Sequence, residues 1–158
     1  MFKTSPAWYQ FGGRRARDAA EELGVSVSPT DIPPPGLSPA HGSLWNLHKM
    51  ITKTTGKNAL LHYSSYGCYC GWGGKGQPKD ATDRCCQRHD TCYNNLLSYH
   101  CNAKIQGYHY GWRRGSPSCS NSWCAQLSCE CDRSLALCLK QNIWTYSKRY
   151  LFYPKHRC

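Results

Sequence analysis

The distribution of cysteine constrains this chain more than any other feature of its sequence. All twelve cysteines lie between residues 43 and 158, which makes about one residue in ten of that segment a cysteine, the density of a disulfide scaffold. Disulfides form and persist in oxidising compartments, whereas cytosolic thiols stay reduced. We therefore expect one disulfide-rich domain over residues 43–158 that folds and works outside the cell.

The first 42 residues have a different composition. They contain no cysteine and six of the nine prolines, and their basic and acidic side chains cancel, so the formal net charge of +11 belongs to residues 43–158. Because such a stretch has little to bury, we expect a disordered leader or an atypical N-terminal extension. It lacks the apolar run of roughly 7–15 residues that a secretory signal requires. Two explanations stay open: an alternative or mispredicted exon, and a genuine extension.

Zinc binding is the alternative explanation for so many cysteines. The motif Cys68-x-Cys70 and the adjacent pair Cys85-Cys86 do not have the spacing of common zinc sites, and no paired histidines follow them. The sequence therefore favours disulfides over zinc.

Cysteine spacing also predicts a pair of helices. Residues 83–100 and 122–141 look helical, and each stretch carries two cysteines seven residues apart, which is close to two helical turns. Facing residues of two antiparallel helices keep a constant sum of residue numbers. The pairs that satisfy this condition are Cys85–Cys138 and Cys92–Cys131. Two bridges are therefore expected to clamp an antiparallel helix pair.

His89 lies between the two cysteines of the first predicted helix, on the face that meets the second helix. Asp132 follows one of the bridged cysteines on the opposite helix, and Tyr93 lies one turn beyond His89. A histidine near a carboxylate can serve as a general base, because its pKa lies near neutrality. Many histidines on helix seams only satisfy a local hydrogen bond, so this pattern alone leaves both interpretations open.

A glycine-rich loop, Tyr66–Gly74 with the sequence YGCYCGWGG, precedes the first of these helices. Its four glycines free the backbone for unusual dihedral angles and for close approach to a ligand. Inward-facing carbonyl oxygens suit a hard cation, and Asp90 offers a carboxylate to balance the charge. The acidic pattern of an EF-hand is absent. A plain glycine-rich turn is the alternative.

The segments YGCYCGWGGKGQPKDATDRCCQRHDTCY and CECDRSLALC together resemble the secreted phospholipase A2 family, of the group II/V type. The resemblance extends over residues 43–158. It implies a mainly α, disulfide-rich fold: an N-terminal helix near Leu44–Thr54, a calcium loop, two long antiparallel helices, and a small two-stranded β-wing in the region Gly107–Ser120. Thr91 stands where most group II members have another cysteine, and this pattern resembles group V.

The same resemblance implies the roles of the site residues. His89 would be the general base and Asp132 its orienting partner. The two tyrosines that would hydrogen-bond to Asp132 are Tyr93 and Tyr108. Calcium would be bound by four residues, namely the carbonyls of Tyr69, Gly71 and Gly73 and the side chain of Asp90. The N–H of Gly71 would also contribute to the oxyanion hole.

Six disulfides follow from the resemblance. They are Cys68–Cys158, Cys70–Cys86, Cys85–Cys138, Cys92–Cys131, Cys101–Cys124 and Cys119–Cys129. They use all twelve cysteines and leave no free thiol.

The implied reaction is calcium-dependent hydrolysis of the sn-2 ester of glycerophospholipids at a membrane interface, which releases a free fatty acid and a lysophospholipid. The alternative is a non-catalytic, phospholipase-like receptor ligand or toxin. Such relatives usually lose Asp90 or the loop glycines, and this chain keeps both.

Charge and tryptophan content indicate the partners. Trp45 and Trp72 are candidates for the membrane interface, because an indole ring combines an apolar body with a polar N–H. The basic surface favours anionic phospholipid membranes, Trp72 extends this to zwitterionic ones, and heparan sulfate is a further polyanionic candidate. Specific nucleic-acid binding is not expected, because the basic residues form no continuous run or recognised motif. We expect a secreted monomer.

Overall fold

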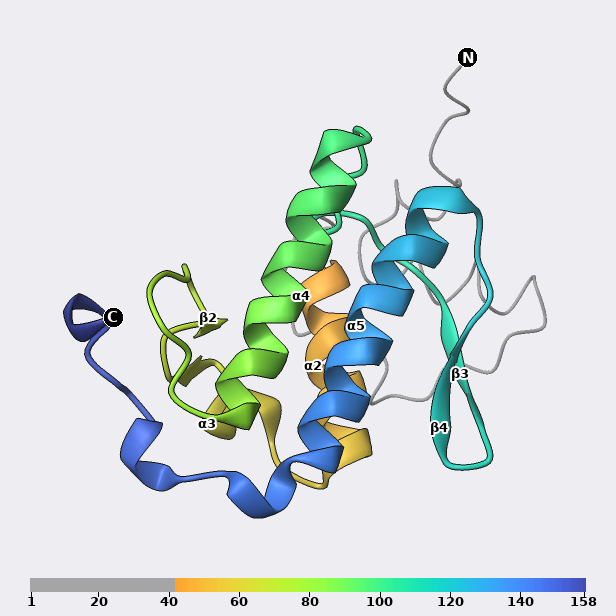
Figure 1. Ribbon diagram of the computed structural model, residues 1–158. Coiled ribbons are helices and arrows are strands. Elements are labelled where there is room, and N and C mark those ends of the chain that lie inside the picture. The colour runs from red at the N-terminus through yellow and green to blue at the C-terminus, as the bar shows by residue number, and fades with distance from the viewer. Residues whose placement is uncertain (1–41) are drawn as a thin grey trace.

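A computed structural model describes residues 42–158 (Figure 1). The expected leader, residues 1–42, lies outside the described residues except for Gly42, with which the first described helix begins. The helices are α2 (Gly42–Thr55), α3 (Ala59–His62), α4 (Ala81–Ser98) and α5 (Trp123–Gln141); the strands are β1 (Ser65–Tyr66), β2 (Cys70–Gly71), β3 (Tyr110–Arg113) and β4 (Ser116–Cys119). Short 3₁₀ turns follow α5: η4 (Ile143–Thr145), η5 (Lys148–Tyr150) and η6 (Lys155–Arg157). The expected mainly α, disulfide-rich fold is confirmed.

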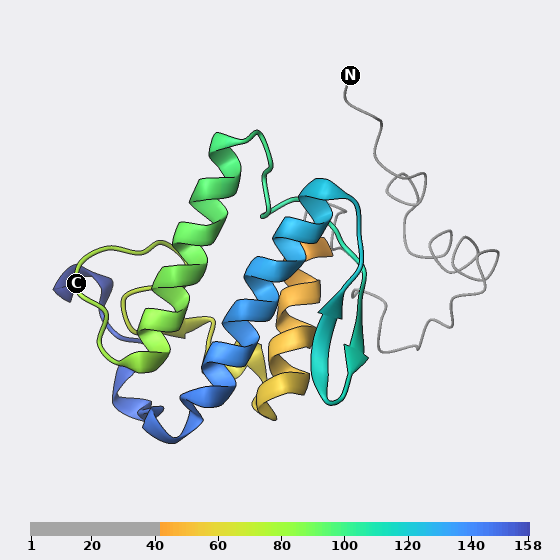
Figure 2. The same cartoon turned by 45° about the vertical axis from the view of Figure 1, so that its right-hand side comes forward.

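Helices α4 and α5 lie side by side in both views and form the centre of the molecule (Figures 1 and 2). Helix α4 begins two residues earlier than predicted, because the side chain of Asp80 caps it by accepting a hydrogen bond from the backbone N–H of Asp83 at 2.8 Å. His100, with a φ of 60°, follows its C-terminal end. The predicted start of the second helix at Ser122 is its N-cap position.

The hydrophobic core lies between α2 and α5. Leu47, Met50 and Ile51 are buried on α2 at helical spacing, and they belong to one cluster with Ala136 and Leu139 of α5. Helix α2 therefore packs against α5, the second of the two long helices. No helix among residues 42–158 is both long enough and apolar enough to cross a membrane.

The β-wing is an antiparallel hairpin in which Tyr110 is opposite Cys119 and Arg113 is opposite Ser116. The two residues at its tip, including Gly115, both have positive φ values, as a tight two-residue hairpin turn requires. The wing is attached to α5 by the disulfide Cys119–Cys129.

The segment after α5, residues 142–158, returns to the glycine-rich loop. The backbone N–H of Phe152 donates to the carbonyl of Ser65 at 2.7 Å, and that of Gly67 donates to the carbonyl of Tyr150 at 2.8 Å. The C-terminus therefore lies beside the loop that contains β2, as Figure 1 shows. We call residues 142–158 the C-terminal segment.

Candidate active site

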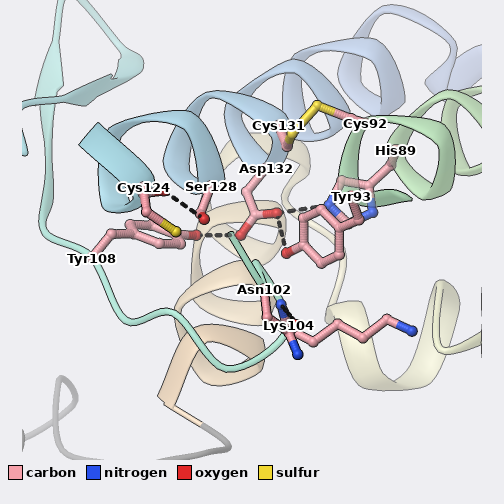
Figure 3. A network of polar contacts seen from close by, with 10 residues as sticks. All are labelled: His89, Cys92, Tyr93, Asn102, Lys104, Tyr108, Cys124, Ser128, Cys131 and Asp132. Atoms are coloured by element: carbon pink, nitrogen blue, oxygen red, sulfur yellow. Dashed lines mark hydrogen bonds and ion pairs between the residues drawn. A yellow bond between two sulfur atoms is a disulfide. The ribbon is translucent and has the colours of Figure 1, made fainter. Parts of the chain in front are cut away.

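His89 and Asp132 face each other across the seam between α4 and α5. Nε2 of His89 lies 2.7 Å from Oδ1 of Asp132. Asp132 is 0% exposed and His89 is 9% exposed. The bridge Cys92–Cys131 lies beside them in Figure 3, and Cys85–Cys138 joins the same two helices. The clamped helix pair thus places the imidazole and the carboxylate in contact.

Two tyrosines complete the surroundings of the buried carboxylate. The hydroxyl of Tyr93 donates to Oδ1 of Asp132 at 2.6 Å, and that of Tyr108 donates to Oδ2 at 2.5 Å (Figure 3). Burial raises the pKa of both tyrosines well above the ordinary value, and the negative charge of Asp132 raises it further. Both hydroxyls therefore remain protonated donors. These hydrogen bonds compensate a buried charge that would otherwise be costly.

This arrangement determines which nitrogen of His89 can act as a base. The ionised carboxylate of Asp132 only accepts hydrogen bonds, so its partners must donate. In its contact with Asp132, Nε2 of His89 is therefore the donor, as the hydroxyl of Tyr93 is. A neutral imidazole then has its lone pair on Nδ1. The geometry is that of a histidine whose tautomer and orientation are fixed by an acidic partner.

Asp90 follows His89 on α4 and touches the glycine-rich loop. A Cβ atom added to Gly74 would lie 2.7 Å from Oδ2 of Asp90 and 2.7 Å from the ring of Tyr69, so the loop backbone packs directly against this carboxylate. Burial raises the pKa of Asp90 to about 6, while His89 and two lysines oppose the shift. A carboxyl group held this close to the loop is a natural partner for a cation.

The donor set at this position fits calcium. Among residues 42–158, no three His, Cys, Asp or Glu side chains form a group that could hold a metal, so a cation here would depend on backbone carbonyls. Gly71 and Gly73 have φ values of 98° and 76°, which turn the backbone in ways that side chains rarely permit. One carboxylate and several carbonyls form an all-oxygen set, which a hard cation prefers. The calcium ligands Tyr69, Gly71, Gly73 and Asp90 remain a prediction.

Asp83 fixes the backbone of the glycine-rich loop, a role that no pattern in the sequence indicates. Its carboxylate is 0% exposed and accepts three backbone hydrogen bonds of 2.8 Å, from the N–H groups of Cys68, Tyr69 and Lys79. It thus holds the start of the glycine-rich loop against α4. In the sequence, an acidic residue in the first turn of a helix indicates only a favourable dipole interaction.

The six disulfides of the structure join the same cysteines that the resemblance implied. Two of them anchor the glycine-rich loop. Cys70–Cys86 attaches it to α4, and Cys68–Cys158 attaches it to the last residue of the chain.

The two tryptophans expected at a membrane interface differ in their surroundings. Trp72 is 94% exposed on the glycine-rich loop. Trp45 is partly buried, and its indole nitrogen is enclosed without a hydrogen-bond partner within the part of the chain that the structure describes. Because an interfacial indole places its N–H among lipid headgroups, Trp72 is better placed than Trp45.

Comparisons with known proteins agree with this geometry. A family model for phospholipase A2 matches residues 44–151. A mouse group IID secretory phospholipase A2 is 50% identical over 125 residues, which cover 78% of this chain and 87% of that protein. A mouse phospholipase A2 group V is 49% identical over 118 residues, covering 74% of this chain and 86% of that protein. The basic phospholipase A2 trimucrotoxin of Protobothrops mucrosquamatus is 52% identical over 118 residues, with coverage of 74% and 84%.

The family model spans most of the disulfide-rich domain, and the two mouse relatives match 78% and 74% of the chain. The matched region contains the glycine-rich loop and the helix pair with His89 and Asp132. The chain therefore belongs to the phospholipase A2 family.

Proposed function

We propose that this protein hydrolyses the sn-2 ester of glycerophospholipids in a calcium-dependent reaction at a membrane surface, releasing a free fatty acid and a lysophospholipid. One observation carries the proposal. His89 contacts the buried carboxylate of Asp132, while the neighbouring Asp90 packs against the backbone of the glycine-rich loop. A base and a cation site on the same turn of α4 are what water-mediated ester hydrolysis requires.

Water is the attacking group in this mechanism. All twelve cysteines are bridged, so none offers a thiolate nucleophile. Nδ1 of His89 takes a proton from the attacking water, and Asp132 stabilises the imidazolium that forms. The imidazolium then gives this proton to the lysophospholipid oxygen as the ester C–O bond breaks. Tyr93 and Tyr108 hold Asp132 in place through both of its oxygens.

The glycine-rich loop provides the electrostatic part of the mechanism. The carbonyls of Tyr69, Gly71 and Gly73 and the carboxylate of Asp90 would hold calcium, which would supply a Lewis acid for the ester carbonyl and a positive charge for the lipid phosphate. The backbone N–H of Gly71 donates to the oxygen on which negative charge develops.

Docking to the membrane uses an aromatic and an electrostatic contribution. Trp72 projects from the glycine-rich loop into solvent and is the proposed interfacial side chain. Each cation near an anionic membrane contributes about 1 kcal/mol at low salt. Lys75 and Lys79 follow the loop, and the C-terminal segment adds Lys148, Arg149 and Arg157. We infer a secreted, monomeric enzyme that acts on anionic and zwitterionic membranes, with heparan sulfate as a further polyanionic ligand.

Two substitutions on neighbouring residues test the proposal. Asp90→Lys should abolish calcium binding and hydrolysis while the fold persists. His89→Gln should keep calcium affinity but lower turnover by at least about 10²–10⁴-fold, the contribution of general acid–base catalysis. The assays are calcium titration and release of labelled sn-2 fatty acid from phospholipid vesicles.

Glu130→Lys provides a matched charge reversal on α5, where the partly exposed Glu130 pairs with Arg133 at 3.6 Å. This control should keep both calcium binding and activity. Hydrolysis at the unmodified rate by Asp90→Lys would overturn the calcium assignment. Full activity in His89→Gln would eliminate water activation by this residue.

A further inference from the structure

Lys155, in the C-terminal segment, contacts the start of the glycine-rich loop. Its Nζ donates a hydrogen bond of 2.9 Å to the carbonyl of Gly67, although the two residues are 88 positions apart in the sequence. Burial lowers the pKa of Lys155, and the negative charges of Asp83 and Asp90 act in the opposite direction, so this ammonium group lies within electrostatic reach of both carboxylates.

The peptide unit between Gly67 and Cys68 is held at both ends by opposite charges. Its carbonyl accepts from Lys155 at 2.9 Å, and its N–H donates to Oδ2 of Asp83 at 2.8 Å. Hydrogen bonds to charged groups are stronger than those between neutral groups, and a peptide unit bonded on both sides is polarised and fixed in orientation. Lys155 therefore also helps to compensate the fully buried charge of Asp83 through this peptide.

The fixed peptide leads directly to the proposed calcium ligands. The next N–H, that of Tyr69, donates to Oδ1 of Asp83 at 2.8 Å, and the carbonyl of Tyr69 is the first proposed ligand. Gly67 must be glycine here, because its φ is 59° and a Cβ atom would lie 2.3 Å from the carboxyl carbon of Asp83. The backbone plane at residues 67–69 thus depends on two charged side chains.

The rest of the C-terminal segment holds Lys155 in this position. Cys158 is bonded to Cys68, and its carbonyl packs so tightly against Gly76 that a Cβ there would lie 1.8 Å from the oxygen. Leu151 forms an antiparallel bridge with Tyr66. The lysine therefore extends from a segment that is attached to the first residue of the glycine-rich loop, to Cys68 within the loop and to Gly76 just after it.

We propose that Lys155 is a positioning residue for calcium: together with Asp83 it orients the Gly67–Cys68 peptide, and through it the carbonyl of Tyr69, before the cation binds. This inference rests on the proposed function. It also predicts a change in calcium affinity opposite to the one that charge alone would cause. A positive charge near a cation site opposes calcium, so removal of the charge alone should strengthen binding. If orientation dominates, removal of Lys155 weakens binding instead.

The test compares Lys155→Met with Lys155→Arg and with Lys148→Met, which removes an exposed lysine from the same segment. Lys155→Met should lower calcium affinity about tenfold, the lower end of the loss for outer-shell partners of metal ligands. Lys155→Arg, which keeps charge and donors, should restore most of this affinity, and Lys148→Met should leave the calcium affinity measured without lipid unchanged. Calorimetric titration with calcium chloride, without lipid, gives the affinities.

Amide hydrogen exchange in the calcium-free protein provides an independent readout. The N–H groups of Cys68 and Tyr69 should exchange faster in Lys155→Met and at the unmodified rate in Lys148→Met. If Lys155→Met does not fold, Lys155→Gln, whose neutral side chain is too short to reach Gly67, gives the same comparison.

Unchanged or tighter calcium binding by Lys155→Met would overturn the inference, and so would unchanged exchange at both amides. In that case calcium-dependent hydrolysis by the unmodified protein would show that the proposed function stands without it. Absence of calcium binding by the unmodified protein would overturn the calcium part of the proposed function and this inference together.

Discussion

The helix pair and the glycine-rich loop contribute to the same candidate site but are built differently. His89 and Asp132 project from regular helices that two disulfides join, and Tyr93 and Tyr108 bond to the same carboxylate. The loop, in contrast, is held through its backbone: by the carboxylate of Asp83, by the ammonium group of Lys155 and by hydrogen bonds to the C-terminal segment.

The difference shows how one small domain can fix the positions of side-chain atoms in one region and the orientation of backbone carbonyls in another. Proton transfer depends on the position of a few side chain atoms, which a rigid helix face supplies. Cation binding by carbonyls depends on the orientation of several peptide planes, and in this protein distant charged residues set that orientation. We therefore expect substitutions in the loop to lower calcium affinity, and substitutions in the helix pair to lower stability or turnover without changing calcium affinity.

Removal of one disulfide from each region should have the largest effect on stability. Replacement of Cys92 and Cys131 by serine opens a loop with a sequence separation of 39, and replacement of Cys68 and Cys158 opens one of 90. Chain entropy predicts that the first change lowers the free energy of unfolding by about 4 kcal/mol and the second by about 4.6 kcal/mol. Only the second should also weaken calcium binding, by about tenfold, because it releases the C-terminal segment from the loop.

Chemical denaturation and calcium titration of the two double variants measure these effects. The Cys101–Cys124 bridge joins the chain after α4 to the first turn of α5 and does not include the glycine-rich loop, so its removal provides a stability control that should leave calcium affinity unchanged. Equal losses of calcium affinity in all three variants would show that the C-terminal segment does not hold the glycine-rich loop independently of the other disulfides.

Gly71→Ala should disrupt the loop and leave the helix pair intact. Gly71 has a φ of 98°, and a Cβ atom would lie 1.8 Å from the backbone oxygen of Ser64, so the chain must move. We expect a loss of about 3 kcal/mol in stability, at the upper end for a strained residue, together with loss of calcium binding.

Gly73→Ala is the matched control for this prediction. Its φ is 76°, but no atom lies within 4 Å of the added Cβ, so it should cost only about 1–2 kcal/mol for the left-handed backbone. Denaturant titration and NMR of the His89 imidazole distinguish the two variants. A shifted NMR signal of the His89 imidazole in Gly71→Ala would contradict the expectation that the glycine-rich loop and the helix pair are independent.

The same contrast explains what the sequence could and could not predict. Helical spacing placed Cys85, Cys92 and His89 on one face, and the resemblance supplied the roles of Tyr93 and Tyr108. The contacts of Asp83 and Lys155 have no periodicity, because they join backbone groups to side chains far away in the sequence. The burial of the indole nitrogen of Trp45 likewise depends on packing and cannot be read from residue type.

Tyr108→Phe should affect the helix pair alone. The hydroxyl of Tyr108 donates to Oδ2 of Asp132, and its removal takes a donor from a fully buried carboxylate. We expect a loss of about 2 kcal/mol in stability, typical of a hydrogen bond to a charged group. Tyr93→Phe should cost less, because His89 still contacts Oδ1.

Calcium affinity should be unchanged in both tyrosine variants. Thermal unfolding with and without calcium measures both quantities at once, because ligand binding raises the stability of the folded state. A smaller calcium-induced stabilisation in Tyr108→Phe than in the unmodified protein would show that the helix pair and the loop are coupled.

The smallest of these effects concerns the outer surface of the loop. Trp72 and Trp144 are each 94% exposed, but Trp72 lies on the glycine-rich loop and Trp144 lies on η4 beyond α5. If the loop faces the lipid, Trp72→Ala should weaken binding to phosphatidylcholine vesicles about tenfold, or about 1.4 kcal/mol, as partial burial of one large ring predicts. Trp144→Ala should bind as the unmodified protein does. Vesicle sedimentation separates the outcomes: equal losses would mean that the docking surface extends past the loop, and a loss in Trp144→Ala alone would place the membrane contact at η4 and not at the loop.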